Sequence, residues 1–250
     1  MAETTAFSNR PFLRAEWRHL ALLNFEVDPR ILGKFVPAGT ELDLWNGHTY
    51  VSVVGFLFLK TRVLGLPIPF HRNFEEVNLR FYVRRKAAEG WRRAVTFIKE
   101  LVPRTAIAWA ARAFYNENYL AVPMSHRLEH EEGDRGQVRS VSYSWLFSGQ
   151  ENRIELVTGS EVSPIQEGSE EEFIAEHYWG YSAQRDGGTI EYRVEHPRWC
   201  VATATEARLD CDVAGLYGEA FRESLERPPS SAFLADGSKV TVFRGVRIGA

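Results

Sequence analysis

The sequence predicts a mainly β protein with some helix (α+β), in which many short antiparallel strands form a barrel or a sandwich. Three observations predict this. Most segments alternate apolar and polar residues with a period of two, the spacing of side chains on one face of a strand. Turn residues separate these segments, as in the Arg-Asp-Gly-Gly stretch at residues 185–188. Segments with helical spacing are few.

The clearest strand covers residues 76–84, where apolar and polar residues alternate without a break. Its apolar face carries Val77, Leu79, Phe81 and Val83. Its polar face carries Glu76, Asn78, Arg80, Tyr82 and Arg84. Further strands are predicted over residues 50–60, 94–100, 139–147, 153–157, 181–184, 189–195, 200–208 and 239–248. The polar stretch at residues 129–137 is typical of a hairpin tip.

Three helices are predicted, over residues 28–35, over residues 103–115 and from Ser169 onward. The first two place a proline in the first turn, where its missing N–H is tolerated. In the third, Ser169 stands three residues before a glutamate, which is the pattern of a capping box. This helix should carry Phe173, Ile174 and His177.

The length and the composition favour one domain over residues 1–250. The chain is longer than the commonest domain, yet single β-barrel domains reach 250 residues. No linker or internal repeat divides it. Only Cys200 and Cys211 occur, which excludes a disulfide framework and a cysteine-rich zinc module. The first ten residues lack the features of a secretory signal, so a cytoplasmic location is expected.

The charges nearly cancel, since 30 basic and 33 acidic residues give a net charge of −3. This balance is not typical of proteins that bind nucleic acid or anionic membranes, so neither partner is expected. The longest mostly apolar run, residues 51–59, is about half of what spans a bilayer.

Residues 126–130 match the H-x-x-E-H string of some zinc peptidases. That chemistry needs a helix, which brings residues four apart onto one face. Here the flanking residues alternate as in a strand, which would separate His126 and His130 by about 13 Å. One zinc ion could not bind both, and no metal site is predicted. No phosphate-binding loop and no nucleophile elbow occurs either.

The polar face of residues 76–84 leaves two interpretations open. In an ordinary antiparallel sheet such a face is solvated. In a closed barrel it lines the interior, where a few convergent polar groups orient a small ligand. In that case Arg80 would attract a carboxylate or an enolate, and Tyr82 could donate a hydrogen bond to it.

Several segments, taken in order, resemble the YqjF-like family, which is uncharacterised and lies in the acetoacetate decarboxylase-like superfamily. They are residues 10–20, 27–32, 42–47, 74–83, 168–169, 173–178 and 194–199. The resemblance covers roughly residues 10 to 205. It implies a cone-shaped, mainly antiparallel β-barrel around a central cavity, with a few helices packed outside. It also implies that Glu76 matches an acidic position of the decarboxylase cavity and that the polar face points inward.

Members of that superfamily use a lysine that forms a Schiff base with a ketoacid. The matching stretch here, residues 113–119, contains no lysine. The chain has five lysines in all, of which Lys99 lies in the apolar strand at residues 94–100, where desolvation would lower its pKa.

The resulting prediction is a small-molecule-binding protein without metal or covalent cofactor, which self-associates into a homo-oligomer. The ligand, a carboxylate or a carbonyl compound, would lie in the barrel among Glu76, Asn78, Arg80, Tyr82, Asn116 and Tyr119. Val77, Leu79, Phe81 and Val83 would face covering helices. The first alternative is a lysine-dependent enzyme acting on a carbonyl compound through Lys99. The second is an interaction protein that uses a surface such as residues 228–231.

Overall fold

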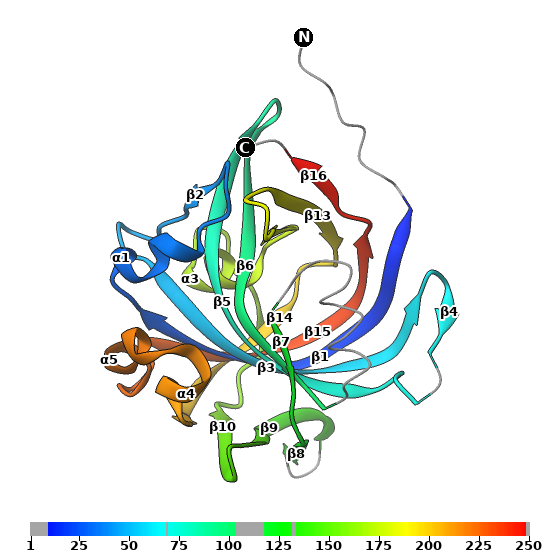
Figure 1. Cartoon of the computed structure of the whole chain (residues 1–250). Helices are drawn as coiled ribbons and strands as arrows, with labels where there is room; N and C mark the ends of the chain where they lie inside the picture. Colours follow the sequence, from blue (N-terminus) through cyan, green and yellow to red (C-terminus); the bar gives the residue numbers. More distant parts are fainter. Residues whose placement is uncertain (1–9, 69, 104–117, 132–133, 249–250) are drawn as a thin grey trace.

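Strands dominate the chain, and the predicted mainly β class is confirmed (Figure 1). The computed structural model describes residues 10–68, 70–103, 118–131 and 134–248. The strands are β1 (Pro11–Glu26), β2 (Glu41–Leu42), β3 (Tyr50–Val63), β4 (Leu66–Pro67), β5 (Phe74–Ala87), β6 (Gly90–Val102), β7 (Tyr119–Ala121), β8 (Met124–Glu131), β9 (Asp134–Phe147), β10 (Gln150–Thr158), β11 (Ser163–Pro164), β12 (Trp179–Ala183), β13 (Thr189–Glu195), β14 (Cys200–Asp210), β15 (Ser231–Phe243) and β16 (Val246–Ile248). The helices are α1 (Pro29–Leu32), α3 (Glu170–Ala175), α4 (Val213–Tyr217) and α5 (Arg222–Leu225), with 3-10 turns η1 (Gly33–Phe35) and η2 (Glu219–Phe221).

The central sheet closes on itself. Its strands follow the order β13-β12-β6-β5-β3-β1-β15, and β15 then pairs with β13, at Val194 opposite Val242. This closure satisfies the edges that an open sheet would expose. The pairings are antiparallel except for β6 with β12 and β6 with β7, which are parallel. The predicted cone-like antiparallel barrel is therefore found, with a parallel pairing that no sequence pattern indicated.

The strands β1, β3 and β5 are buried on both faces. In β5, Val77, Leu79, Phe81 and Val83 are all 0% exposed and belong to the outer hydrophobic cluster. The alternate residues Glu76, Asn78, Arg80 and Tyr82 are also buried, on the inner face. In β5 the usual apolar-in, polar-out pattern is therefore inverted, because its apolar residues face the outer cluster and its polar residues face the inside of the barrel.

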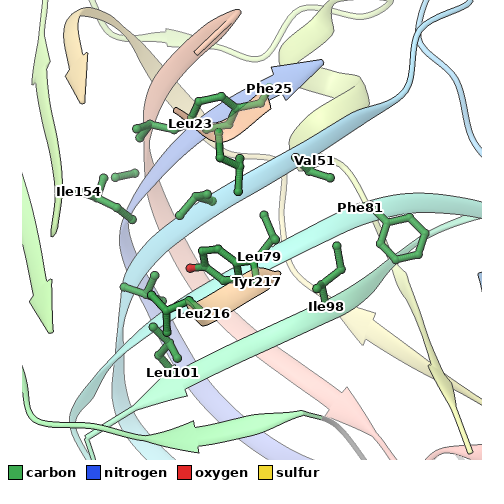
Figure 2. Close-up of a cluster of buried hydrophobic side chains, with 14 of the residues drawn as sticks. Leu23, Phe25, Val51, Leu79, Phe81, Ile98, Leu101, Ile154, Leu216 and Tyr217 are labelled. Atoms are coloured by element: carbon green, nitrogen blue, oxygen red, sulfur yellow. The ribbon is translucent and has the colours of Figure 1, made fainter. Parts of the chain in front are cut away.

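A second sheet covers the outside of the barrel. It runs β14-β10-β9-β8, and α4, η2 and α5 pack beside it. Figure 2 shows Leu216 and Tyr217 of α4 and Ile154 of β10 among side chains from the barrel strands, including Leu79 and Leu101. The odd-numbered residues of β5 thus belong to an outer cluster that also contains side chains of α4, α5 and the second sheet. The predicted covering helix at residues 103–115 lies outside the described residues, except for Pro103.

The other predicted elements are largely found. Ser169 accepts a hydrogen bond from the Glu172 N–H at 3.2 Å and begins α3, as predicted. The helix ends at Ala175, so His177 lies beyond it and not on it, which corrects the prediction. The predicted strand over residues 239–248 breaks into β15 and β16. Residues 126–130 lie in β8, as the alternation predicted. No described helix has the length and apolarity needed to cross a bilayer.

Replacement of Leu79 by alanine should lower the free energy of unfolding by about 2–5 kcal/mol, because the residue is fully buried and its loss leaves a cavity. Leu146→Ala is the matched control, since Leu146 lies on β9 with 45% of its surface exposed. That control should cost less than about 0.5 kcal/mol. Urea unfolding of both variants checks the prediction, and equal losses would contradict the burial assigned to β5.

Candidate functional site

The inner face of the barrel encloses a cavity of about 350 Å³. The strands β1, β3, β5, β6 and β13 supply most of its wall. Aromatic rings dominate the lining, and they belong to Phe12, Trp17, Phe56, Phe58, Phe74, Phe97, Tyr119, Trp179, Tyr192 and Trp199. Phe58 and Phe74 stack with their ring centroids 4.7 Å apart, and Trp17 meets Phe56 and Phe58 edge-on. The wall is therefore mostly apolar and carries many flat aromatic rings.

Polar side chains gather on one part of this wall. They are Glu76, Asn78 and Arg80 of β5, Glu100 of β6, Tyr119 of β7 and His177 after α3. Strand pairing accounts for part of the grouping, because Asn78 lies directly opposite Glu100, and cross-strand partners share one face. The structure thus brings together four residues predicted for the site, namely Glu76, Asn78, Arg80 and Tyr119.

Glu76 is 3% exposed, and its carboxylate accepts a hydrogen bond from the Asn78 amide at 3.0 Å and another from Tyr119. Burial removes the water that would stabilise the ionised form. This desolvation outweighs the two hydrogen bonds and raises the pKa of Glu76 from 4.5 to about 7. Near neutral pH the group can therefore hold a proton or release it.

Arg80 is buried and donates from Nη2 to the Ile174 carbonyl at 2.9 Å. That bond ties the guanidinium to the end of α3. Its Nε is buried and has no hydrogen-bond partner among the described residues, and the same holds for Oδ1 of Asn78. Buried polar atoms are nearly always satisfied, so these two are exceptions on the cavity wall.

His177 was not among the predicted site residues. Its ring stacks on Tyr82 with centroids 5.0 Å apart, and burial together with Arg93 and Arg80 holds its pKa well below its ordinary value of 6.5. The ring is therefore neutral, with one N–H and one bare nitrogen. The Ile174 carbonyl lies nearby, but neither nitrogen makes a hydrogen bond of good geometry with a described residue. Its place just after a capped helix was the only sequence signal.

Tyr82 does not line the cavity, which corrects its predicted role as a ligand donor. Its ring lies on the inner face, but its hydroxyl shares a hydrogen bond with the buried Ser52. The Ser52 hydroxyl donates in turn to Asn24 at 2.6 Å, and the Asn24 amide donates to Ser231 at 3.0 Å. This chain of bonds satisfies polar groups between β5, β3, β1 and β15. The predicted Asn116 lies outside the described residues.

Lys99 is half-buried but is absent from the cavity lining. It pairs with Leu79 across β5 and β6, and Leu79 belongs to the outer cluster, so Lys99 lies on the outer face of the barrel. No other lysine lines the cavity in the described part of the chain. The alternative mechanism through Lys99 therefore lacks the geometry it requires.

The family follows from comparison with known proteins. A family model, DUF2071, described as an uncharacterized conserved protein, matches residues 14–239. The chain belongs to this family. Its sequence is also 27% identical over 220 residues to the uncharacterized protein YqjF of Bacillus subtilis (strain 168), which covers 85% of this chain and 84% of that protein. The resemblance to the YqjF-like family is confirmed.

Solved structures share the fold at low sequence identity. Acetoacetate decarboxylase from Legionella pneumophila superposes with a TM-score of 0.65 at 12% identity, over 99% of this chain and 92% of that one. The enduracididine biosynthesis enzyme MppR complexed with pyruvate gives a TM-score of 0.68 at 10% identity, over 99% and 93%. An acetoacetate decarboxylase-like enzyme from Sphingomonas wittichii RW1 gives 0.65 at 12%, over 96% and 94%. The predicted acetoacetate decarboxylase-like fold is confirmed.

The raised pKa of Glu76 makes stability depend on pH in a defined direction. Between pH 4.5 and about 7 the folded protein binds a proton that the unfolded chain has lost, so the wild type loses up to about 3 kcal/mol as the pH rises through this window. Glu76→Gln, which stays neutral, should gain stability relative to the wild type by that amount between pH 4.5 and pH 8. Urea unfolding at both pH values measures it; a difference that does not change with pH would contradict the shift.

Proposed function

We propose that the cavity binds a small molecule that has a carboxylate or a carbonyl group at one end and an apolar, preferably aromatic, body. The observation that carries this proposal is the set of buried polar atoms with no partner among the described residues, on Asn78, Arg80 and His177. All three residues line the same part of the cavity. A carboxylate or carbonyl oxygen would accept hydrogen bonds from Arg80 and His177, which these donors otherwise lack among the described residues, whereas Asn78 Oδ1 is itself an acceptor and needs a donor.

The donors at this end favour an oxygen acceptor. Arg80 supplies an N–H and the only arginine or lysine charge among the described lining residues. Neutral His177 offers a second N–H, and Glu76 can offer a third donor when it holds its proton. Charge-assisted bonds of this type are among the strongest in proteins. A carboxylate or carbonyl oxygen matches them, whereas a cationic head group would meet Arg80.

The rest of the wall favours an apolar body. The rings of Trp17, Phe58, Phe74 and Trp199 present flat faces and edges that suit an aromatic ring. A cavity of about 350 Å³ is at the lower end of ordinary ligand pockets, so the ligand is small. The fold neighbours named for acetoacetate or solved with pyruvate support a small acid with a carbonyl group.

The proposal does not include a Schiff base, because no lysine lines the described part of the cavity. Recognition would instead depend on hydrogen bonds from Arg80 and His177 and on the protonation of Glu76. A lower pH within the range 5 to 8 should strengthen binding of a carboxylate, since protonation of Glu76 removes a like charge and adds a donor.

Thermal-shift measurements with phenylpyruvate and phenylacetate should show stabilisation of the wild type that rises with ligand concentration. The alcohol 2-phenylethanol, with the same apolar body and no acid, should stabilise it far less. Arg80→Gln should weaken binding at least about tenfold, the loss of one charge-assisted hydrogen bond. Arg84→Gln is the matched control, since Arg84 lies on the same strand but pairs with Glu41 outside the cavity. Equal shifts for acid and alcohol, or equal losses in both variants, would contradict the proposal.

A further inference from the structure

A hairpin of exposed residues lies where the cavity meets the protein surface. Ile68 lines the cavity and is 38% exposed, which makes it the most open of the described lining residues. It belongs to the rim hairpin, defined as residues 62–68 with Phe70, which includes the end of β3 and β4. Figure 1 shows β4 projecting from the ring on the side away from α4 and α5. The hairpin thus forms part of the cavity entrance.

The rim hairpin exposes apolar side chains that no packing requires. Leu64 is 70% exposed, Leu66 is 72% and Phe70 is 84%, the three highest values among the large apolar residues described. Leu64 and Gly65 form the turn with φ of 51° and 84°. A leucine backbone is strained in this left-handed region, where asparagine or glycine is usual. Because Leu64 is exposed, burial of its side chain does not explain why a leucine occupies this position. Clusters of exposed apolar residues mark interaction surfaces.

Arginines surround these apolar side chains. Arg14 and Arg62 are exposed and lie directly opposite each other on β1 and β3, where like charges destabilise the pair. Arg72 is exposed and follows the rim hairpin in the sequence. Arg244 is exposed and follows Phe243, which pairs with Pro11 of β1. None of these four arginines takes part in an ion pair between described residues. The neighbouring Glu16 is already occupied, because it pairs with Lys60 at 2.8 Å.

We infer that the rim hairpin docks on the surface of an anionic lipid membrane. The apolar residues would enter the interface between head groups and acyl chains, while the arginines would contact the anionic head groups. The apolar side chains would thus meet an apolar layer and the arginines would meet negative charge, which relieves the repulsion between Arg14 and Arg62. This docking also places the cavity entrance at the membrane, so the protein could take an apolar ligand directly from the lipid. The inference does not depend on the identity of that ligand.

Charge argues against a second copy of the chain as the occupant. A symmetric contact sets a surface against itself, so it would bring the arginines of one copy against those of the other. The net charge of −3 predicts no membrane partner, but it averages over the whole surface and hides this local excess of arginine. The membrane contact inferred here is peripheral and uses the hairpin alone.

Vesicle co-sedimentation with the full chain tests the inference. The wild type should sediment with phosphatidylcholine vesicles that contain phosphatidylserine, much less with phosphatidylcholine alone, and less as salt is added. The double variants Leu64→Ser with Leu66→Ser, and Arg14→Glu with Arg62→Glu, should each lower the partition coefficient at least about tenfold. Leu146→Ser and Arg185→Glu are the matched controls, because both residues are exposed elsewhere, and they should bind as the wild type does.

Circular dichroism and thermal melting should show that the double variants fold, as expected for exposed positions. Absence of wild-type binding to the anionic vesicles would overturn the inference. So would binding that the rim variants leave unchanged. A wild-type dimer that the leucine variant splits, without vesicle binding, would assign the hairpin to contact between copies instead.

Discussion

Burial of the strands β1, β3 and β5 on both faces is the constraint on which the rest of the structure depends. The outer face needs a cover, which the second sheet and α4 and α5 provide. The inner face is also lined mostly by apolar side chains. They do not fill the barrel, so a cavity remains where a small barrel would have a solid core. Any polar side chain on that inner face is then taken out of water. Its cost must be met by a partner inside the protein or by a ligand.

The register of β5 follows from the same constraint. A shift of one residue would move Val77 and Leu79 from the outer cluster into the cavity and would force Glu76 and Arg80 against Leu216 and Tyr217. The apolar packing outside thus determines which side chains reach the cavity. The strand network of Ser52, Asn24 and Ser231 satisfies the inner polar groups that the cavity does not use. The buried polar atoms left without a partner among the described residues of the cavity wall include those of Asn78, Arg80 and His177, together with Trp17 Nε1 and Thr61 Oγ1.

Most of the strands could be predicted, because β5, β9 and β13 alternate clearly and because Ser169 carries its cap in the sequence. The strand β1 was not predicted, since residues 20–25 are an almost unbroken apolar run, as a strand buried on both faces must be. The short helices α4 and α5 lack enough turns to show a helical period.

The site could be predicted only where one strand carries it. Alternation placed Glu76, Asn78 and Arg80 on one face, and the family resemblance indicated which face was inside. It could not show that the Tyr82 hydroxyl would turn to Ser52, because that contact joins two strands. His177 enters the cavity from the loop after α3. The contact that brings this region to β5, from Arg80 to the Ile174 carbonyl, joins residues 94 positions apart and depends on tertiary structure alone. The extra residue Ile98 in β6 likewise decides that Lys99 lies outside, because Leu79 pairs with Lys99 while the next residue, Arg80, pairs with Phe97.

We propose that the polar part of the cavity holds the acid or carbonyl end of a ligand while the aromatic wall holds its body. A crystal structure of the protein soaked with 4-bromophenylacetate tests this proposal. The anomalous signal of bromine locates the ring without reliance on the shape of the electron density. We expect one bromine peak among Trp17, Phe58 and Phe74 and a carboxylate within hydrogen-bond distance of Arg80 or His177. A bromine peak only outside the barrel, or a carboxylate directed to the entrance, would contradict it.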